Sequence, residues 1–467
     1  MLDHVARRIE NLGKPERVGI AVSAGGDSVF LAHALHRLGC AAALLHVNHQ
    51  LRGPASDADE AFTRQLARQL DVPFHSTCAP IGAGNAPGNL EQEARYARYT
   101  WFADCKSALG LDAIATGHTL DDQAETVFLR FLRGAGTQGL AGIRPSTRDG
   151  VIRPLLGLRR TDIRQWLREN GLAWREDESN TSTRFDRNRA RLETLPQLER
   201  DYNPGLSSIL ASTAKWALDE EDYWSGELDR LAPELLDPRG ETVFLKVNQI
   251  SLQPVALQRR LLRRAIALVR GNLRSIDFDH VEGIRALLKT TEGSGRIQLP
   301  GLEAYRSFNQ LRLGPPGFDA RLERDFEAPL AVPGRTTLAE RFITFDMELV
   351  TGEPVYNDDR DALDLSRCPG SLWVRNWRPG DSYWPQGGSG AVKIKQLFQE
   401  FRVPLWERRT WPVVVAGDPR EESSPRVIVW SRRFGRAEQF GAGPGSRNVL
   451  LIRESGESKR AAGTSKD

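Results

Sequence analysis

The sequence predicts an α/β fold with a parallel sheet in its N-terminal part, followed by a mainly helical domain and a small α+β domain. In the N-terminal part, short apolar runs alternate with amphipathic helical stretches, which is typical of right-handed βαβ units. Helical periodicity dominates the middle of the chain, and short β-runs surround one helix near its C-terminus. At roughly 100 to 200 residues per domain, a chain of 467 residues suits about two to four domains.

These changes in pattern divide the chain into four segments and a tail. We expect a ligand-binding α/β domain over residues 1–200 and a mainly helical domain over 201–315. Residues 316–365 are less regular and are expected to link it to an α+β domain over 366–455. The last residues, 456–467, are polar and small, so we expect a disordered tail.

The composition limits the class of protein. The net charge is only +3, from 64 basic and 61 acidic residues, so any surface that binds nucleic acid must come from local clusters. The four cysteines form no CxxC pair, which argues against a disulfide framework or a zinc site and favours a reducing cytoplasm. No run of about 18 apolar residues occurs, so nothing directs the chain to a membrane.

The first strand, turn and helix lie within Arg17–Leu31 (RVGIAVSAGGDSVFL). Backbone N–H groups at the start of a helix attract anions, and glycines let a phosphate approach closely. An ordinary strand-to-helix turn is the alternative, and no GxxxxGK[ST] loop occurs in the chain. Asp27 is placed to hold Mg²⁺ beside a phosphate. The residues expected to form the anion site are Ser23, Ala24, Gly25, Gly26, Asp27 and Ser28.

The remaining N-terminal elements continue the alternation. Because ligands lie at the carboxyl ends of parallel strands, the glycine turn, His46–His49 and Gly117 with His118 are expected at one edge of the sheet. Strands are expected over 18–22, 41–47, 72–77 and 111–116, and helices over 57–70, 90–109, 121–133 and 161–171.

The second half of the chain is expected to begin with helices and to end with strands. The helices are expected over 206–235, 254–269 and 280–289, and a β-rich piece over 296–313 closes this part. Farther on, the runs LWVRNW, PVVVAG and RVIVWS predict strands that begin near residues 372, 412 and 426.

An acidic helix start, HTLDDQAET, covers His118–Thr126. On a helix Asp122 and Glu125 are three residues apart and Asp121 and Glu125 four apart, so carboxylates share a face. Such a pair suits metal binding, recognition of an ammonium group, or removal of a proton from an amine. A stabilising acidic first turn is the structural alternative, and His118 alone is more typical of a hydrogen-bonded structural residue.

Two basic regions are candidates for contact with RNA. Arginine matches phosphate oxygens with a planar, permanently charged fork, although a solvated charged face is the alternative. Residues 375–398 interleave basic side chains with Trp377, Tyr383 and Trp384, which suits phosphate contact and base stacking if the aromatic rings are not core. The first region contains Arg130, Arg133, Arg184, Arg187, Arg189 and Arg191.

The turn SAGGDS at Ser23–Ser28 resembles the SGGxDS pattern of the PP-loop ATP pyrophosphatases, with Ala24 in place of the first glycine. Within that superfamily, longer segments resemble the tRNA(Ile)-lysidine synthase family. The resemblance implies a Rossmann-like sheet of the adenine nucleotide alpha hydrolase type. The matching segments are His46–Glu60, Glu91–Tyr99, Ala115–Ile143, Arg153–Leu156, Glu176–Leu198 and Arg378–Phe398.

The resemblance implies a ligase that modifies tRNA in the cytoplasm. ATP would activate carbon 2 of the wobble cytidine in a CAU-anticodon tRNA(Ile), giving an adenylated base and pyrophosphate. The ε-amine of L-lysine would then displace AMP and leave lysidine, which changes codon reading from AUG to AUA. The implied cofactors are ATP and Mg²⁺, and a homodimer is an open alternative to a monomer.

The resemblance also assigns roles to residues. Asp122 is the first candidate to take a proton from the amine and Glu125 the second, with one of them as an alternative lysine-binding residue. Asp27 would hold Mg²⁺, His118 would contact the nucleotide, and Arg95 would stabilise the adenylated intermediate. The side chains expected to contact tRNA are Arg130, Arg133, Arg187, Arg189, Arg191, Arg375, Arg378, Lys393 and Lys395.

Three other functions are weighed against this one. A tRNA thiolase would need a sulfur-carrying cysteine or an Fe–S site, which isolated cysteines do not support. An amidotransferase would need a glutaminase partner, of which the chain has no sign. A nucleotide-sensing RNA-binding protein without catalysis would bind ATP and release no pyrophosphate.

Overall fold

The computed structural model describes most of the chain in two compact units, Met1–Glu227 and Leu228–Asp467. Each unit is described by itself. The segment 177–185, which includes Arg184, lies outside the described residues. The described ranges are 1–50, 53–79, 90–176, 186–289, 294–317, 325–339, 343–351, 360–418, 426–443 and 445–456.

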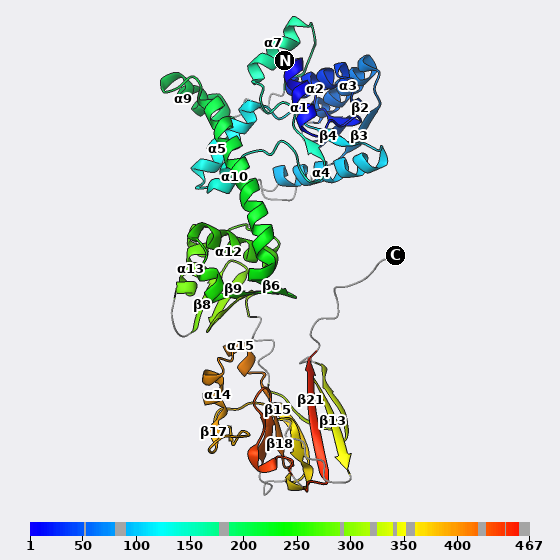
Figure 1. Ribbon diagram of the computed structural model, residues 1–467. Coiled ribbons are helices and arrows are strands. Elements are labelled where there is room, and N and C mark those ends of the chain that lie inside the picture. The colour runs from blue at the N-terminus through cyan, green and yellow to red at the C-terminus, as the bar shows by residue number, and fades with distance from the viewer. Residues whose placement is uncertain are drawn as a thin grey trace. The chain divides into compact units, whose positions relative to one another are not determined.

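The first unit is built on a five-stranded parallel sheet with the strand order β3-β2-β1-β4-β5. Strands β2, β3 and β4 of this sheet are labelled in Figure 1. The chain moves outward from β1 in one direction to β2 and β3, and then returns to the other side of β1 to form β4 and β5. A ligand crevice is expected where the order reverses, at the carboxyl ends of β1 and β4. The strands are β1 (Val18–Ala21), β2 (Ala41–Asn48), β3 (Phe74–Cys78), β4 (Ala113–Ala115) and β5 (Val151–Ile152).

Helices cover both faces of this sheet, which explains why its central strands are continuous apolar runs. On one face Ile20 of β1 packs in a core with Phe30 and Leu31 of α2 (Gly26–Arg37) and with Ile163 of α7 (Arg160–Glu169). On the other face Phe102 of α4 (Leu90–Ala108) packs with residues of β2 and β4. The two cores hold the carboxyl ends of β1 and β4 in a fixed frame.

The other helices of the first unit surround this frame. They are α1 (Leu2–Asn11), α3 (Pro54–Leu70), α5 (Leu120–Leu132), α6 (Thr137–Leu140), α8 (Asp186–Arg189), the π-helix η2 (Ala190–Thr194) and α9 (Leu195–Asp201). The long helix α10 (Leu206–Leu235) contains the boundary between the two units.

The second unit begins with an antiparallel sheet of order β6-β7-β10-β9-β8, which packs with helices around one core. We expected helices in this part with β-structure only at its end, so β6 and β7 are additions to that expectation. The elements are β6 (Leu236–Arg239), β7 (Thr242–Lys246), α11 (Val247–Ser251), α12 (Val255–Arg270), α13 (Phe278–Lys289), β8 (Ser294–Leu299), β9 (Leu302–Ser307) and β10 (Gln310–Gly314).

The C-terminal part has two larger antiparallel sheets, β11-β15-β18-β19-β20 and β12-β13-β21-β14, and the hairpin β16-β17. A single core contains residues from both larger sheets, including Val414 and Phe345. The elements are β11 (Glu327–Pro329), β12 (Gly334–Leu338), β13 (Ile343–Thr351), β14 (Ala362–Asp364), η5 (Leu365–Arg367), β15 (Leu372–Asn376), β16 (Ser382–Tyr383), β17 (Val392–Lys393), α14 (Ile394–Glu400), α15 (Leu405–Arg408), β18 (Pro412–Ala416), β19 (Val427–Ser431), β20 (Gly435–Arg436), η6 (Glu438–Phe440) and β21 (Asn448–Gly456).

The segment 316–365 differs from the less regular linker that we expected. Its strand β13 pairs with β21 from Ile343 opposite Gly456 to Thr351 opposite Asn448, and β11 pairs with β15. Because these partners are far away in sequence, local periodicity does not indicate the pairing. Within the described residues, no helix is long and apolar enough to cross a membrane.

Candidate functional site

The loops after β1 and β4 meet at the point where the strand order reverses. A Cβ built on Gly117, which follows β4, would lie 3.1 Å from the backbone nitrogen of Ser28 and 3.2 Å from the carbonyl carbon of Asp27. Such contacts with backbone atoms are tighter than a Cβ normally makes, so a larger residue would require the turn to shift. Gly117 therefore brings the end of β4 directly against the first turn of α2.

The turn before α2 contains the residues of the expected anion site. Gly25 is the N-cap of α2 and provides no side-chain cap. No hydrogen bond from the backbone N–H groups of Gly26 and Asp27 is found within the described residues. The first N–H groups of a helix have no partner in the helix itself and form a ready site for anions. The geometry thus suits a phosphate at this turn.

Side chains within the turn fix its shape. The Ser28 hydroxyl donates to the Gly25 carbonyl across 2.8 Å and accepts from the Ser23 backbone N–H across 3.2 Å. Ala24 is fully buried and has a φ of 65°, a left-handed conformation that favours glycine. Its carbonyl accepts a hydrogen bond from the Arg175 backbone N–H across 3.0 Å. The superfamily pattern has glycine at this position, and the left-handed conformation explains why glycine suits it better than alanine.

The start of α5 places the acidic residues beside this turn. Thr119 is the N-cap, and a reciprocal capping box joins it to Asp122. The Thr119 backbone N–H and hydroxyl each donate to Oδ2 of Asp122 across 2.8 Å. The structural alternative, an acidic first turn that only stabilises the helix, is thus partly right for Asp122, because Oδ2 of its carboxylate caps α5. The other oxygen, Oδ1, points to a cluster of arginines.

Arg160, the first residue of α7, lies at the centre of that cluster. Its guanidinium donates to three carboxylates: Nε to Asp27 across 3.2 Å, Nη2 to Asp122 across 3.0 Å and Nη1 to Glu125 across 3.3 Å. Its backbone N–H donates to Oδ2 of Asp121 across 2.7 Å. Sequence reasoning missed Arg160, since nothing in its neighbourhood separates it from other arginines at a helix start.

Two arginines that we expected on the tRNA surface also reach these carboxylates. Arg187 donates from Nη2 to Asp122 and from Nε to Glu125, both across 2.9 Å. Nε of Arg191, in η2, lies 3.9 Å from Oε1 of Glu125. The Glu125 side chain is only 3 % exposed, so these contacts form a largely buried network of charges. The arginines neutralise carboxylates that would otherwise repel one another.

The network shifts the pKa values of its members. Burial disfavours the charged form of Asp122, but Arg160 and Arg187 outweigh it and hold the pKa of this carboxyl below its usual range. Burial raises the pKa of Asp27, with Arg160 opposing the rise. Burial lowers the pKa of His118 to about 4. His118 is therefore neutral near pH 7, and its Nδ1 lies 2.9 Å from the Thr116 hydroxyl.

The other expected site residues have varied surroundings. The Arg95 guanidinium lies over the ring of Tyr99, 4.8 Å from its centroid, and its charge acts on His118. Arg130 donates to the carbonyls of Gly139 and Gly142 across 3.0 and 2.9 Å, and thereby holds the loop after α5. Arg133 and Arg189 are exposed, and both lie within ion-pair distance of Asp186.

The C-terminal basic residues divide into two kinds. Arg375 is buried, and its two terminal nitrogens donate to Asp381 across 2.7 and 2.9 Å. This pairing leaves Arg375 in a structural role, which differs from the surface role that we expected. Arg378 donates to Glu327 across 3.0 Å and is partly exposed, and Lys393 and Lys395 are exposed.

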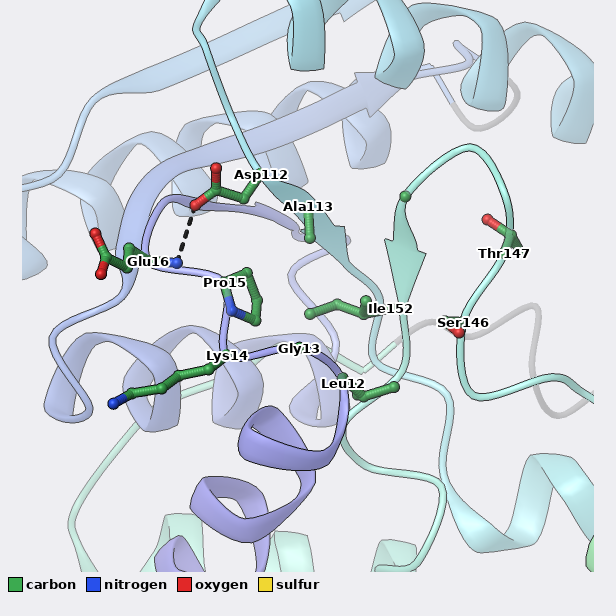
Figure 2. Close-up of a pocket in the computed structure, with 11 residues that line it drawn as sticks. Leu12, Gly13, Lys14, Pro15, Glu16, Asp112, Ala113, Ser146, Thr147 and Ile152 are labelled. Atoms are coloured by element: carbon green, nitrogen blue, oxygen red, sulfur yellow. Dashed lines mark hydrogen bonds between the residues drawn. The ribbon is translucent and has the colours of Figure 1, made fainter.

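A separate depression of about 560 Å³ lies at the amino ends of β1 and β4, the opposite edge of the sheet (Figure 2). Lys14, Glu16, Asp112 and Thr147 are among its lining residues. Oδ2 of Asp112 accepts the Glu16 backbone N–H across 2.9 Å, as the dashed line in Figure 2 marks. This hydrogen bond fixes the segment of chain that precedes β1, so Asp112 has a structural role.

The strand order, the glycine turn and the free helix N-terminus define a nucleotide-binding α/β protein of the PP-loop class. A family model described as a PP-loop domain matches residues 1–198. Models described as the TilS substrate binding domain and the TilS substrate C-terminal domain match residues 245–312 and 372–419.

Full-length relatives identify the family. A tRNA(Ile)-lysidine synthase of Solibacter usitatus is 45 % identical over 446 residues, which cover 94 % of this chain and 98 % of that protein. The tRNA(Ile)-lysidine synthase of Symbiobacterium thermophilum is 37 % identical, and the match covers 97 % of this chain and 97 % of that protein. That of Geobacter sulfurreducens is 36 % identical, and the match covers 94 % of this chain and 93 % of that protein. The chain belongs to the tRNA(Ile)-lysidine synthase family, enzymes that modify tRNA with the use of ATP.

Proposed function

We propose that this chain joins L-lysine to carbon 2 of the wobble cytidine in a CAU-anticodon tRNA(Ile). ATP first adenylates the base with release of pyrophosphate, and the lysine ε-amine then displaces AMP. The product, lysidine, changes the codon read from AUG to AUA. The observation that carries this proposal is the carboxylate pair Asp122 and Glu125 beside the free N-terminus of α2, since it joins a phosphate site to an amine site.

The turn supports the first step. Backbone N–H groups of Gly26 and Asp27 and the hydroxyl of Ser23 are suited to phosphate oxygens. We propose that Asp27 holds Mg²⁺, which would offset charge on the departing pyrophosphate. The donor set fits, because Mg²⁺ commonly takes one or two carboxylates and completes its shell with water and phosphate oxygens. Within the described residues there is no cluster of three or more ligands for a metal held by protein alone.

The carboxylate pair supports the second step. Asp122 stays ionised because its pKa is held low, so it can attract the lysine ammonium. An ammonium has no lone pair, so the nitrogen must first lose one proton to water before it attacks. Once nitrogen bonds to the activated carbon its N–H becomes strongly acidic, and even a weakly basic carboxylate can accept this second proton. We propose Asp122 as this acceptor, with Glu125 as the second candidate. His118, neutral near pH 7, is proposed to contact the nucleotide, and Arg95 to stabilise the adenylated base.

Exposed basic side chains support the binding of tRNA. We propose that Arg133, Arg189, Arg378, Lys393 and Lys395 contact phosphates. The proposal leaves out Arg375, which is buried, and also Arg130, Arg187 and Arg191, whose guanidinium groups face carbonyls or carboxylates of the protein. The anticodon bases must be unstacked for the cytidine to reach the turn. We also propose a cytoplasmic location, where tRNA, ATP and lysine are all present, and we leave a homodimer as an assembly to be tested by sedimentation.

A mixture of protein, ATP, Mg²⁺, lysine and a CAU-anticodon tRNA(Ile) transcript tests the proposal. We expect AMP and pyrophosphate, together with a gain of mass on the anticodon fragment equal to lysine minus water. ATP binding without these products would instead favour a nucleotide-sensing RNA-binding protein. A thiolase is not supported, since no cysteine takes part in the described contacts of the site.

A further inference from the structure

We propose that Arg160 is a positioning residue that couples nucleotide binding at the Ser23–Ser28 turn to amine binding at Asp122 and Glu125. The inference rests on the proposed function, because it assigns the turn to ATP and the carboxylate pair to lysine. One side chain then links the two subsites, so that the occupancy of one changes the affinity of the other.

The main chain of Arg160 is fixed in position. Its backbone N–H donates to Asp121 across 2.7 Å at the start of α7. Helix α7 packs on α2 through Ile163, in the core that also contains Ile20 of β1. The side chain is only 12 % exposed. With its backbone fixed and little room around it, the guanidinium can respond to a ligand chiefly by changing which anions it contacts.

Arginines occupy the carboxylate oxygens of Asp122 and Glu125. Oδ2 of Asp122 is used by Thr119, and Oδ1 accepts from both Arg160 and Arg187. Oε1 of Glu125 accepts from Arg160 and Oε2 from Arg187. An ammonium group entering this pair must therefore compete with guanidinium groups for the same oxygens, which weakens its binding.

A nucleotide bound at the turn would bring negative charge close to Arg160. Nε of Arg160 lies 3.2 Å from Asp27, a residue of the first turn of α2. A triphosphate at this helix N-terminus would place several anionic oxygens near the same guanidinium, and arginine binds phosphate in a bidentate manner. As Arg160 turns toward phosphate, Asp122 and Glu125 lose part of their compensation, and their attraction for an ammonium group rises.

The expected result is positive coupling: nucleotide tightens lysine binding, and lysine tightens nucleotide binding by the same factor. The coupling gives an order to the reaction. The amine subsite reaches full affinity only when the phosphate subsite is filled, so lysine is held most tightly when an activated base can form.

Calorimetric titration of L-lysine into the full chain, with and without saturating α,β-methylene-ATP and Mg²⁺, measures the coupling. This analogue cannot release pyrophosphate, and no tRNA is present, so no chemistry interferes. We expect the analogue to lower the Kd of lysine by at least about fivefold in the natural protein. In Arg160→Gln the ratio should fall below about twofold, with lysine binding in the absence of nucleotide as tight as or tighter than in the natural protein.

Arg159→Gln is the matched control. Arg159 is the preceding residue, and within the described part of the chain it forms ion pairs with Asp121 and Glu199. It does not share the carboxylate partners of Arg160 at Asp27, Asp122 and Glu125, so this variant should keep the coupling. Arg160→Lys retains the charge but cannot span three carboxylates, so the coupling should be reduced in this variant. The lysine variant also tests the inference if the glutamine variant does not fold.

A ratio near one in the natural protein, undetectable lysine binding with the analogue present, or full coupling in both Arg160 variants would overturn the inference. Formation of lysidine is a separate readout. A protein that makes lysidine without coupling refutes only the role of Arg160, whereas coupling without lysidine refutes only the proposed reaction.

Discussion

The carbonyl of Ala24 accepts a hydrogen bond from the backbone N–H of Arg175 across 3.0 Å, while Ala24 itself has a φ of 65°. The bond joins the Ser23–Ser28 turn to the segment that follows α7. It also holds an alanine in a conformation that costs an L-residue roughly 1 to 2 kcal/mol relative to the right-handed region.

Replacement of Ala24 by glycine tests whether this strain matters. Glycine removes the strain but makes the unfolded chain more flexible, so the net change in the free energy of unfolding should stay within about 1 kcal/mol. We expect a change in KM for ATP or in kcat and no change in tRNA affinity. Ala32→Gly, inside α2, is the control and should destabilise by about 1 kcal/mol. Altered tRNA affinity in Ala24→Gly would show that the turn has another role.

Asp122→Asn tests the second step of the reaction. Asparagine keeps an oxygen for the Thr119 cap but cannot carry the charge that faces Arg160 and Arg187. We expect lysine transfer to fall by about 10² to 10⁴, with tRNA affinity retained. Single-turnover measurement of lysidine formation, alongside filter binding of tRNA, separates the two effects. A product yield close to that of the natural protein would remove Asp122 from the mechanism.

His118 provides a prediction about stability and pH. Its folded pKa is about 4, below its ordinary value of 6.5, mainly because it is buried. Between these pH values the unfolded chain binds a proton at this position that the folded chain does not, so this residue makes stability fall as pH falls from about 6.5 to about 4. The loss approaches about 3 kcal/mol at most.

His118→Gln should remove that contribution. The free energies of unfolding of the two proteins are compared by urea titration at pH 7.5 and pH 5. The variant should lose less stability than the natural protein between the two pH values, since glutamine does not titrate. His4, His33 and His49 also have lowered pKa values and are unchanged in both proteins. Equal losses in both proteins would contradict the burial of a neutral His118.

Lys393 and Lys395 test the tRNA surface of the C-terminal part. Both are exposed, and replacement of each by alanine should reduce the slope of log affinity against log salt by about 0.7 to 0.9. Arg375→Gln is the contrasting variant, because it leaves the largely buried Asp381 without its charged partner and should destabilise the fold by about 3 to 5 kcal/mol. Salt-dependent tRNA binding and thermal unfolding measure the two effects. An unchanged salt slope in the double lysine variant would exclude these residues from the interface.

Much of the first unit could be predicted from the sequence. Apolar runs and helical periodicity indicated β1 to β4 and α2 to α5, because each of these elements has a local pattern. The two-residue strand β5 was missed, since so short a strand carries no periodicity. The strands of the segment 316–365 were missed for another reason, since β13 depends on a partner about a hundred residues away.

The site was predicted in part. Asp27, Asp122 and Glu125 were indicated by a glycine turn and by carboxylates on one helix face. Arg160 was not indicated, because its three carboxylate partners come from α2 and α5 and meet only through the tertiary fold. The contacts of Arg187 with Asp122 and Glu125 could not be predicted either. In sequence, an arginine that binds a carboxylate cannot be distinguished from one that binds a phosphate.

The most direct test of the account is the mass of the anticodon fragment after reaction with ATP, Mg²⁺ and lysine. With a CAU-anticodon tRNA(Ile) transcript, we predict a gain equal to lysine minus water on the wobble cytidine, with one AMP formed for each modified tRNA. The same reaction without lysine should release pyrophosphate and yield no such gain. An unmodified fragment in the complete reaction, with ATP bound and intact, would contradict the account.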